Sequence, residues 1–291
     1  MHQYLKAIGF DNLKTKRDIK EILSDVENHF TYHELVSCED GVSFCEYRKE
    51  YEDTIGISVC GEMDSNENFD KEYYFPYFRG TGITSYADIT VERRIEKEEY
   101  VGICEDVKVG VSLIFHLQNG MEYMKEKESG HLPKLSTTVT LSGLALSGTV
   151  LFPIMKNEAQ KKTRQEESRN RMLLLSAAKN GDQTAIETLT LEDIDTYSKV
   201  SQRLNTEDVF SIVDTYFMPY GVECDQYSIL GEIREMKLLK NKSTDVELME
   251  ITVEVNELVF DICVPKKDIL GEPAVGRRFK ANIWLQGYIN F

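Results

Sequence analysis

The chain has 291 residues, of which 41% are hydrophobic and 10% aromatic, enough to bury a core and unlike a disordered protein. At roughly 150 residues per domain, this length predicts two domains or one large domain with an added module. Because 50 acidic residues outnumber 34 basic ones, the net charge is −16. This charge disfavours binding to nucleic-acid phosphates and to anionic lipids unless the basic residues gather in a patch.

Neither the N-terminal segment nor any later stretch predicts export or a membrane span. Charges interrupt the first residues before the apolar core of a signal peptide could form. The longest nearly uncharged stretch, 135–155, alternates in a β-like way and contains Ser, Thr and Gly, whereas a membrane helix needs about 20 mainly apolar residues. Six cysteines without a CxxC pair predict reduced thiols. We therefore expect a cytoplasmic protein.

Residues 1–155 predict an α+β region with a large antiparallel sheet. A helix is expected to begin after Thr15, with Asp18 completing a capping box. A second short helix is expected at 121–128. Runs rich in β-forming residues, separated by turn residues, predict strands at 42–51, 53–63, 71–78, 85–95, 99–106 and 109–119. Two further strands are expected within 137–154, ending at Pro153.

Residues 156–223 predict a helical connector or small bundle. The segment 156–180 carries 7 bases and 3 acids, whereas 181–223 carries 2 bases and 9 acids, and these shifts suggest boundaries near 155 and 224. The helix at 157–179 is polar at first and apolar at its end, so it is expected to begin exposed and end buried. Two more helices are expected, at 190–204 and 207–217.

Residues 224–291 predict a small β-barrel of the OB-like or SH3-like type. Strands are expected at 227–239, 247–255, 258–264 and 277–289. Asn256 and Glu257 are expected to form the tight turn between the second and third of these strands. The predicted fold class is thus α+β, with three parts: a sheet domain at 1–155, a helical bracket at 156–223 and a barrel at 224–291.

One cluster has the composition of a metal site, namely His29, His33, Cys38 and Cys45. Two imidazoles one helical turn apart and two thiolates could form a tetrahedral zinc site. Against this interpretation, the two cysteines are six residues apart rather than two to four, and the apolar Phe44 suits an alternating strand. That alternative makes Cys45 a core thiol, and no cofactor is predicted.

Two glycine-containing loops are candidates for anion binding. In the first, Arg79 precedes Gly80 and Gly82, whose amides could converge on an anion. In the second, at 270–278, the glycine spacing imitates a phosphate loop, but Arg277 and Arg278 stand where a lysine and a hydroxyl residue are needed. Ordinary turns are the favoured interpretation of both loops.

Motifs for nucleophilic catalysis are missing from the sequence. Ser58 fails the GxSxG pattern because Cys60 replaces the second glycine. His116 lies in an apolar strand, where a packed core histidine is favoured over a poised base. The barrel segment interleaves nine bases with aromatic residues, as in single-strand binding, but eleven acids offset them and Trp284 suits a core.

Several strings along the chain carry a resemblance to a known family. They are MHQYLKAIGF, GVSLIFHLQNGMEYM, LEDIDTYSKVSQRL, DVFSIVDTYFMPYGVECDQYSILGEI, KKDILGEP and GRRFKANIWLQG. The chain resembles a family from clostridia and related Firmicutes that is known as domain of unknown function 3881. The resemblance implies a cytosolic protein of low-GC Gram-positive bacteria, and it assigns no catalytic or binding residue.

The leading hypothesis is a cytosolic, non-enzymatic binding or adaptor protein with an unidentified protein or small-molecule partner. The alternative is an enzyme or small-molecule-binding protein with a pocket between the N-terminal sheet and the helices. A third hypothesis is single-strand nucleic-acid binding through the barrel. The basic helix is a further candidate surface, because Lys161, Lys162 and Arg164 could dock an acidic protein or the N-terminal domain of the same molecule.

Overall fold

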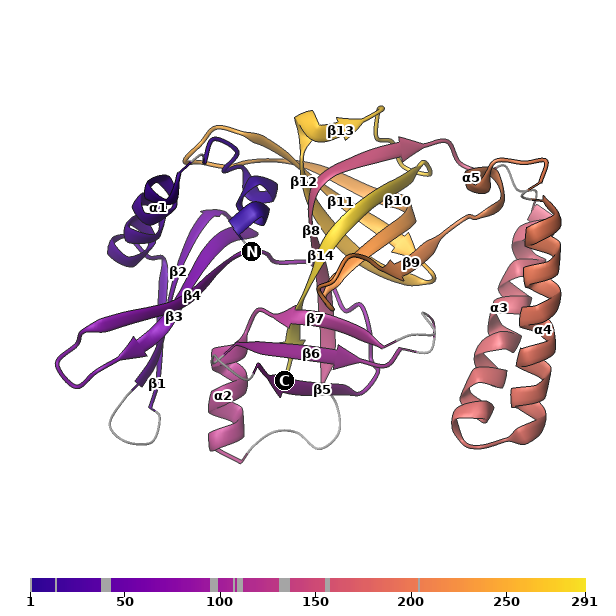
Figure 1. Ribbon diagram of the computed structural model, residues 1–291, viewed down its shortest axis with the longest axis horizontal. Helices are drawn as coiled ribbons and strands as arrows, with labels where there is room; N and C mark the ends of the chain where they lie inside the picture. Colours follow the sequence, from indigo (N-terminus) through magenta and orange to yellow (C-terminus); the bar gives the residue numbers. More distant parts are fainter. Residues whose placement is uncertain are drawn as a thin grey trace.

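The computed structural model describes residues 2–13, 15–37, 43–94, 99–106, 108, 112–130, 137–154, 158–203 and 205–291. These residues form an α+β fold with a four-stranded sheet, a second sheet that contains a closed barrel, and a separate pair of long helices (Figure 1). The predicted fold class is confirmed. Among the described helices, none is long and apolar enough to cross a membrane.

The first sheet is an antiparallel meander with one helix beside it. Its strands, in spatial order, are β1 (Tyr32–Ser37), β2 (Ser43–Glu52), β3 (Ile55–Met63) and β4 (Phe69–Phe78). The helix α1 (Lys16–Asn28) begins as predicted, since the Thr15 hydroxyl accepts a hydrogen bond from the Asp18 amide and the Asp18 carboxylate accepts one from the Thr15 amide. Leu23 and Val26 are its buried residues.

The second sheet closes on itself to form a five-stranded barrel. The barrel strands are β8 (Thr138–Leu151), β10 (Gln226–Lys240), β11 (Glu247–Val255), β12 (Leu258–Pro265) and β14 (Arg278–Asn290). The strands β10, β11 and β12 form a meander, β14 pairs with β10, and β8 closes the ring between β12 and β14. The predicted small barrel is therefore confirmed.

Shorter elements extend or cover the barrel sheet. The short strands are β5 (Ile89–Arg93), β6 (Tyr100–Cys104), β7 (Leu113–Leu117), β9 (Tyr216–Pro219) and β13 (Ile269–Leu270). The short helices are η1 (His2–Ile8), α2 (Gly120–Glu128) and η3 (Lys266–Asp268). The ring of Phe115 on β7 packs directly against the backbone of Gly102 on β6 and Gly287 on β14. A Cβ atom added to these glycines would lie only 2.1 Å and 2.4 Å from the ring, so neither position has room for a side chain.

The strand β8 corrects one prediction. The segment 137–154 forms a single strand from Thr138 to Leu151 instead of two, and it ends just before Pro153 as expected. Its partners β12 and β14 come from the segment predicted to form the barrel alone. The division into domains at 155 and 224 remains a prediction, and the barrel takes one of its five strands from the N-terminal side of the first boundary.

The helices after β8 also differ from the prediction at several ends. The first, α3 (Glu158–Lys179), lies where it was expected, but α4 (Gln183–Arg203) begins seven residues before the predicted start at 190. Its first turn is capped by the Asp182 carboxylate, which accepts hydrogen bonds from the amides of Thr184 and Ala185. The predicted helix at 207–217 shortens to α5 (Val209–Ile212), and β9 follows it.

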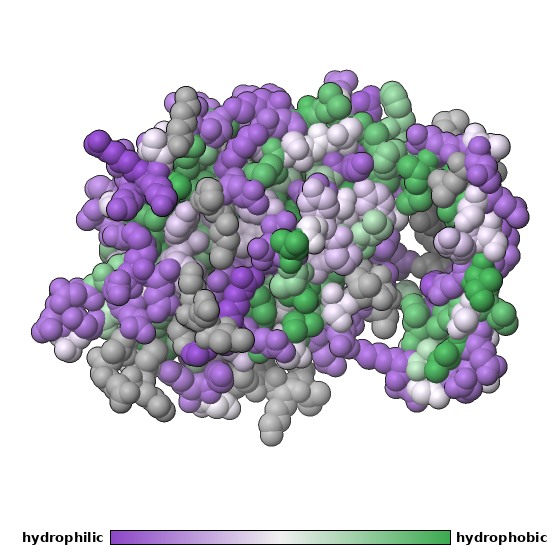
Figure 2. Space-filling model, viewed as in Figure 1, coloured by the Kyte–Doolittle hydropathy of each residue, from purple (hydrophilic) through white to green (hydrophobic). Residues whose placement is uncertain are grey.

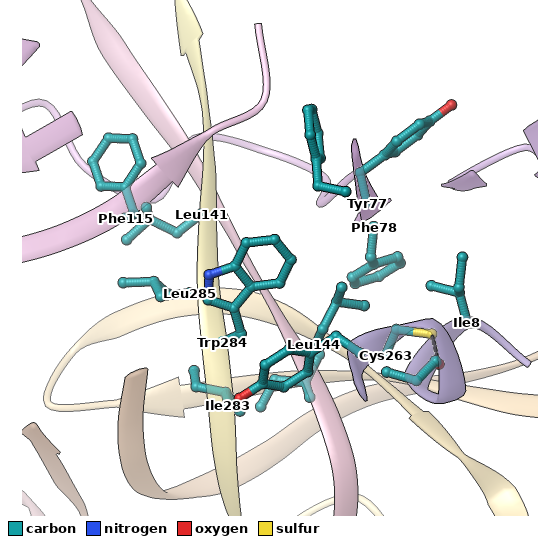
Figure 3. Packing of buried hydrophobic residues seen from close by; sticks show 14 of the residues in the cluster. Ile8, Tyr77, Phe78, Phe115, Leu141, Leu144, Cys263, Ile283, Trp284 and Leu285 are labelled. Carbon is teal, nitrogen blue, oxygen red and sulfur yellow. Dashed lines mark hydrogen bonds between the residues drawn. The ribbon is translucent and has the colours of Figure 1, made fainter. Parts of the chain in front are cut away.

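A continuous hydrophobic core connects the barrel with the first sheet. Figure 3 shows Trp284 and Leu285 of β14 near Leu144 of β8, with Phe78 of β4 and Ile8 of η1 close by. All five side chains are buried. Burial of apolar surface on this scale is the main favourable contribution to folding.

A buried polar network links the same elements. The Gln286 side chain accepts hydrogen bonds from the Phe78 amide and the Gln118 side chain, and it donates one to the Pro76 carbonyl. The Ser142 hydroxyl donates to the Phe78 carbonyl. Because buried polar groups are costly unless they are paired, these bonds fix the end of β4 against β7, β8 and β14.

Candidate functional site

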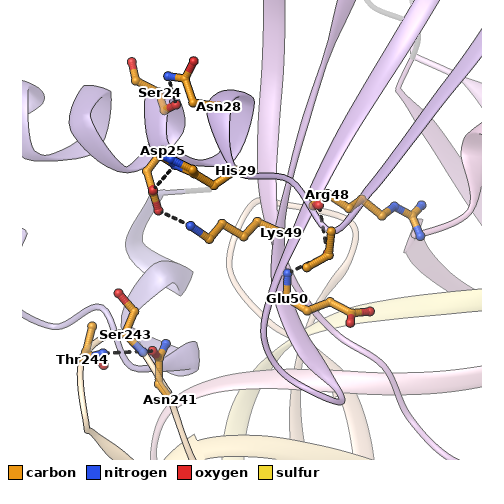
Figure 4. A network of polar contacts seen from close by, with 11 residues as sticks. Ser24, Asp25, Asn28, His29, Arg48, Lys49, Glu50, Asn241, Ser243 and Thr244 are labelled. Carbon is orange, nitrogen blue, oxygen red and sulfur yellow. Dashed lines mark hydrogen bonds and ion pairs between the residues drawn. The ribbon is translucent and has the colours of Figure 1, made fainter.

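The four candidate metal ligands are partly brought together. His33 on β1 and Cys45 on β2 lie beside each other, with Nε2 and Sγ 3.2 Å apart. His29 caps the end of α1, where its Nδ1 lies 2.9 Å from the Asp25 carboxylate, which also binds Lys49 (Figure 4). Cys38 lies outside the described residues. Within the described ranges, no three potential ligands cluster closely enough to hold a metal ion, so the metal site remains a prediction.

The described cysteines have raised thiol pKa values. Burial raises the pKa of Cys45 to about 11, and the pKa values of Cys60, Cys104, Cys224 and Cys263 are also raised, chiefly by burial. A nucleophilic cysteine needs the opposite shift, because the thiolate is the reactive form. The four buried thiols, Cys45, Cys60, Cys104 and Cys263, therefore suit packing positions, and the raised pKa also disfavours covalent catalysis by the exposed Cys224.

The loop after β4 binds a carboxylate from the same protein. Both the amide and the hydroxyl of Thr81, which lies between Gly80 and Gly82, donate hydrogen bonds of 2.7 Å to Asp261 on β12. The guanidinium of Arg79 lies over the ring of Tyr288. The Thr81 amide, between the two glycines, is thus already bound to a carboxylate of the protein, and anion binding by the Gly80 and Gly82 amides remains a prediction.

Arg277 and Arg278, in the second candidate loop, connect the barrel with the chain segments on both sides of the helices α3 and α4. Arg278 donates hydrogen bonds from its guanidinium to the backbone carbonyls of Phe152, Val213 and Phe210. Arg277 donates to the Glu272 carbonyl and lies over the Phe152 ring. Each of these guanidinium groups therefore has partners within the protein, and the two candidate loops do not form one site.

A buried ion pair at the centre of the first sheet was missed in the sequence. Glu46 and Arg48, both on β2, are only 2% and 8% exposed, and the Glu46 Oε1 lies 2.8 Å from the Arg48 Nε. The Ser58 hydroxyl donates to the same oxygen, and Arg48 donates to the Gln118 carbonyl at 2.6 Å. Burial acts to lower the pKa of Arg48, but the charge and the hydrogen bond of Glu46, with smaller contributions from Tyr77 and Cys60, together raise it. Arg48 therefore keeps its positive charge inside the protein, beside the Glu46 carboxylate.

A small pocket lies beside this pair, between the first sheet and α2. Its polar lining comes from Glu46, Cys60 and Gln118. The other side chains that line it are apolar or aromatic, namely Phe44, Tyr73, Phe75, Tyr100, Leu117, Met121 and Met124. The Glu46 Oε2 has no hydrogen-bond partner among the described residues. The pocket has room for about one water molecule. A pocket of this size is too small for a metabolite.

His116 is a packed core histidine, as expected. Its ring is 1% exposed and lies between the rings of Phe75 and Trp284. Its Nδ1 lies 3.3 Å from the buried Glu99 carboxylate. Neither His116 nor Glu99 lines the pocket beside Glu46, so the carboxylates of Glu46 and Glu99 do not share one cavity.

The basic side chains and the aromatic rings of the barrel do not share an exposed surface, because most of these rings are buried. Four of the rings proposed for stacking on bases are buried, namely Tyr227, Phe260, Phe279 and Trp284. Several bases form ion pairs with acids nearby, for example Arg234 with Glu254 and Lys266 with Glu247. Among the described residues, the barrel surface therefore lacks the alternation of exposed rings and unpaired cations that single-strand binding uses.

The helical hairpin of α3 and α4 carries several large exposed apolar residues. Leu191, Ile194 and Tyr197 on α4 are 68%, 58% and 76% exposed. At about 100° per residue, they share one face of the helix, roughly opposite the buried Ala185 and Leu189. The neighbouring positions on this face are Gln183, Ile186, Glu187, Thr190, Ser198 and Ser201, of which only Glu187 is charged. We call these nine residues the outward face of α4.

Part of the hairpin differs from the sequence-based expectation. The second half of α3 was expected to be buried, but Leu173 is 63% exposed and its apolar neighbours are half-buried. Space-filling Figure 2 shows hydrophobic residues gathered on the visible side of the hairpin. The spacing of Leu191, Ile194 and Tyr197 shows in the sequence that the three residues share one face of a helix, but it does not show that this face is exposed.

A comparison with known families assigns the chain. Residues 5–287 match the family model described as "Domain of unknown function, E. rectale Gene description (DUF3881)". The chain belongs to the DUF3881 family. The resemblance expected from the sequence is confirmed, and the DUF3881 match runs through both sheets and the hairpin. No curated protein and no solved structure matches the chain.

Proposed function

We propose that this protein is a cytoplasmic bacterial adaptor without catalytic machinery of its own, and that it docks a protein through the outward face of α4. The observation that carries the proposal is the exposure of Leu191, Ile194 and Tyr197 on a face with one charge. Contiguous exposed apolar residues on soluble proteins mark interaction surfaces. Docking would remove these side chains from water, which contributes roughly 1.5–3 kcal/mol for each fully buried large aliphatic residue.

The rest of the molecule supports a binding role more than a catalytic one. The raised pKa values of the described thiols disfavour a thiolate nucleophile. The pocket beside Glu46 has room for about one water molecule. Both candidate anion loops already bind groups of the protein itself, at Asp261 and at the carbonyls around Arg278.

Photocrosslinking in the source cell tests this proposal, with a matched control in the same chain. A photoreactive p-benzoylphenylalanine replaces Tyr197 in one variant and Tyr86 in the other, because these two rings are 76% and 77% exposed. We expect discrete crosslinked species from position 197 and none above background from position 86. Equal yields at the two positions would overturn the assignment of α4 as the docking surface.

A further inference from the structure

We infer that the hairpin of α3 and α4 is a hinged arm with two positions, latched to the barrel sheet by the ion pair of Lys179 with Glu105 and released when that pair breaks. This inference goes beyond the proposed function, because it concerns how the arm is held and can fail while docking on α4 stands. Three observations lead to it: the contact at the tip of the hairpin, the contacts at its base, and the packing between them.

The tip of the hairpin meets the barrel sheet in an exposed ion pair. Lys179 is the last residue of α3, and its Nζ lies 2.9 Å from the Oε2 of Glu105, which directly follows β6. The negative charge of Asp88 also acts on Lys179. Both side chains of the pair are 59% exposed. Water and dissolved ions therefore reach the pair and weaken it.

The base of the hairpin is held more firmly. The guanidinium of Arg278, a buried residue, donates hydrogen bonds to the carbonyl of Phe152 before α3 and to the carbonyls of Phe210 and Val213 after α4. The Nζ of Lys280 lies 4.4 Å from the centre of the Phe210 ring. Hydrogen bonds from a charged donor stabilise a structure more than an exposed ion pair does. The arm therefore pivots at its base, and its tip is the end that moves.

Between its base and its tip, the hairpin packs mainly on itself. Among the described elements, α3 and α4 make their extensive contact with each other and not with a strand. Figure 1 shows the two helices side by side at the edge of the molecule, joined to the barrel at one end and turned back at the other. Leu173 on α3 and Leu191 on α4 are exposed, so these large apolar side chains do not anchor the arm.

The strength of the latch sets the populations of the two positions. An exposed ion pair shifts an equilibrium by at most about five-fold, because water already solvates both charges when they are apart. Latched and released molecules therefore coexist. Since charges in 1 M salt are screened over about 3 Å, added salt releases the arm, and whatever binds α4 moves with it.

Double electron–electron resonance on the full-length protein measures the two positions. In a background with Cys38→Ser and Cys224→Ser, spin labels are attached at Tyr86→Cys and Leu191→Cys, two exposed positions. The first lies next to Ser85, which binds Asp106 beside the latch, so the latched arm gives the shorter distance. We expect two distances at low salt and a several-fold fall in the ratio of short to long at 1 M NaCl. One narrow distance that salt does not change would overturn the inference.

Charge variants test which pair holds the arm. Lys179→Gln should lower the ratio of short to long distances by up to about five-fold and should abolish its dependence on salt. Lys179→Glu should also lower the ratio, and adding Glu105→Lys should restore it, because the exchanged charges pair again. Circular dichroism checks that each variant keeps its helix content.

The matched control is Lys199→Gln, which removes an exposed ion pair with Asp195 inside α4. It should leave both distances and their ratio unchanged, because this pair does not reach the barrel sheet. An unchanged ratio in Lys179→Gln, or an equal fall in Lys199→Gln, would contradict the latch.

Discussion

The body of the molecule, meaning the two sheets with η1, α1 and α2, differs from the hairpin in how its polar groups are paired. In the body, partners come from distant parts of the chain, as when Gln286 binds Phe78 and Asn241 binds Ile8. In the hairpin, the ion pairs are exposed: Lys199 binds Asp195 on the same helix, and Lys179 at the end of α3 binds Glu105 of the body. The body therefore depends on cooperative long-range contacts, whereas the hairpin is an attached arm with a free surface.

The largest expected effect comes from breaking the buried ion pair of the body. Glu46→Gln leaves the Arg48 guanidinium buried without its counter-charge, and we expect the free energy of unfolding to fall by about 3–5 kcal/mol. The matched control is Asp193→Asn, which removes the exposed pair with Arg171 on the hairpin and should cost less than about 1 kcal/mol. Urea denaturation measures both changes. Similar losses in the two variants would contradict the comparison.

Alkaline pH should destabilise the body through its buried tyrosines. Burial raises the pKa values of Tyr51, Tyr73 and Tyr77. Above about pH 10, these residues ionise in the unfolded chain while the folded protein keeps their protons, so the free energy of unfolding falls as pH rises. Denaturation at a series of pH values measures the slope.

Two variants identify the source of that slope. Tyr73→Phe should make the alkaline slope less steep, because it removes one group that retains its proton on folding. Tyr197→Phe on the hairpin should leave the slope unchanged, because this ring is exposed in the folded state as well. An unchanged slope for Tyr73→Phe would show that the loss has another origin.

The smallest effect on the body is expected from removing the hairpin. The carbonyls of Phe152, Phe210 and Val213 all bind the Arg278 guanidinium, so the chain leaves and re-enters the barrel at nearly one place. Replacing residues 155–207 with a short Gly-Ser linker should change the free energy of unfolding by less than about 1 kcal/mol. Near-ultraviolet circular dichroism of Trp284 reports whether the barrel stays intact, and loss of that signal would contradict the separation of arm and body.

Local signals in the sequence predicted most of the elements. The strand at 247–255 was predicted at its exact bounds, and the turn after it has positive φ at both Asn256 and Glu257. The capping box at Thr15 likewise allowed the start of α1 to be predicted, because both of its hydrogen bonds join residues that are three apart in the sequence. Such features depend on neighbours in the chain and can be recognised without knowing the fold.

The features that were missed depend on distant contacts. The segment 137–154 was predicted to form two strands, but pairing with β14 along most of its length keeps it a single strand. The exposure of Leu191 and Ile194 could not be predicted, because apolar residues at helical spacing usually form a core. The pairing of Glu46 with Arg48 was hidden among the alternating charges of β2.

The place of β8 in the barrel has a consequence for the order in which the protein folds. During synthesis β8 emerges before the hairpin, whereas its strand partners β12, β13 and β14 emerge more than a hundred residues later. Because non-local pairing must overcome the entropy of closing the intervening chain, the barrel forms slowly and late. Until these strands arrive, the edges of β8 lack their barrel partners on the nascent chain, and such open edges favour pairing with other chains.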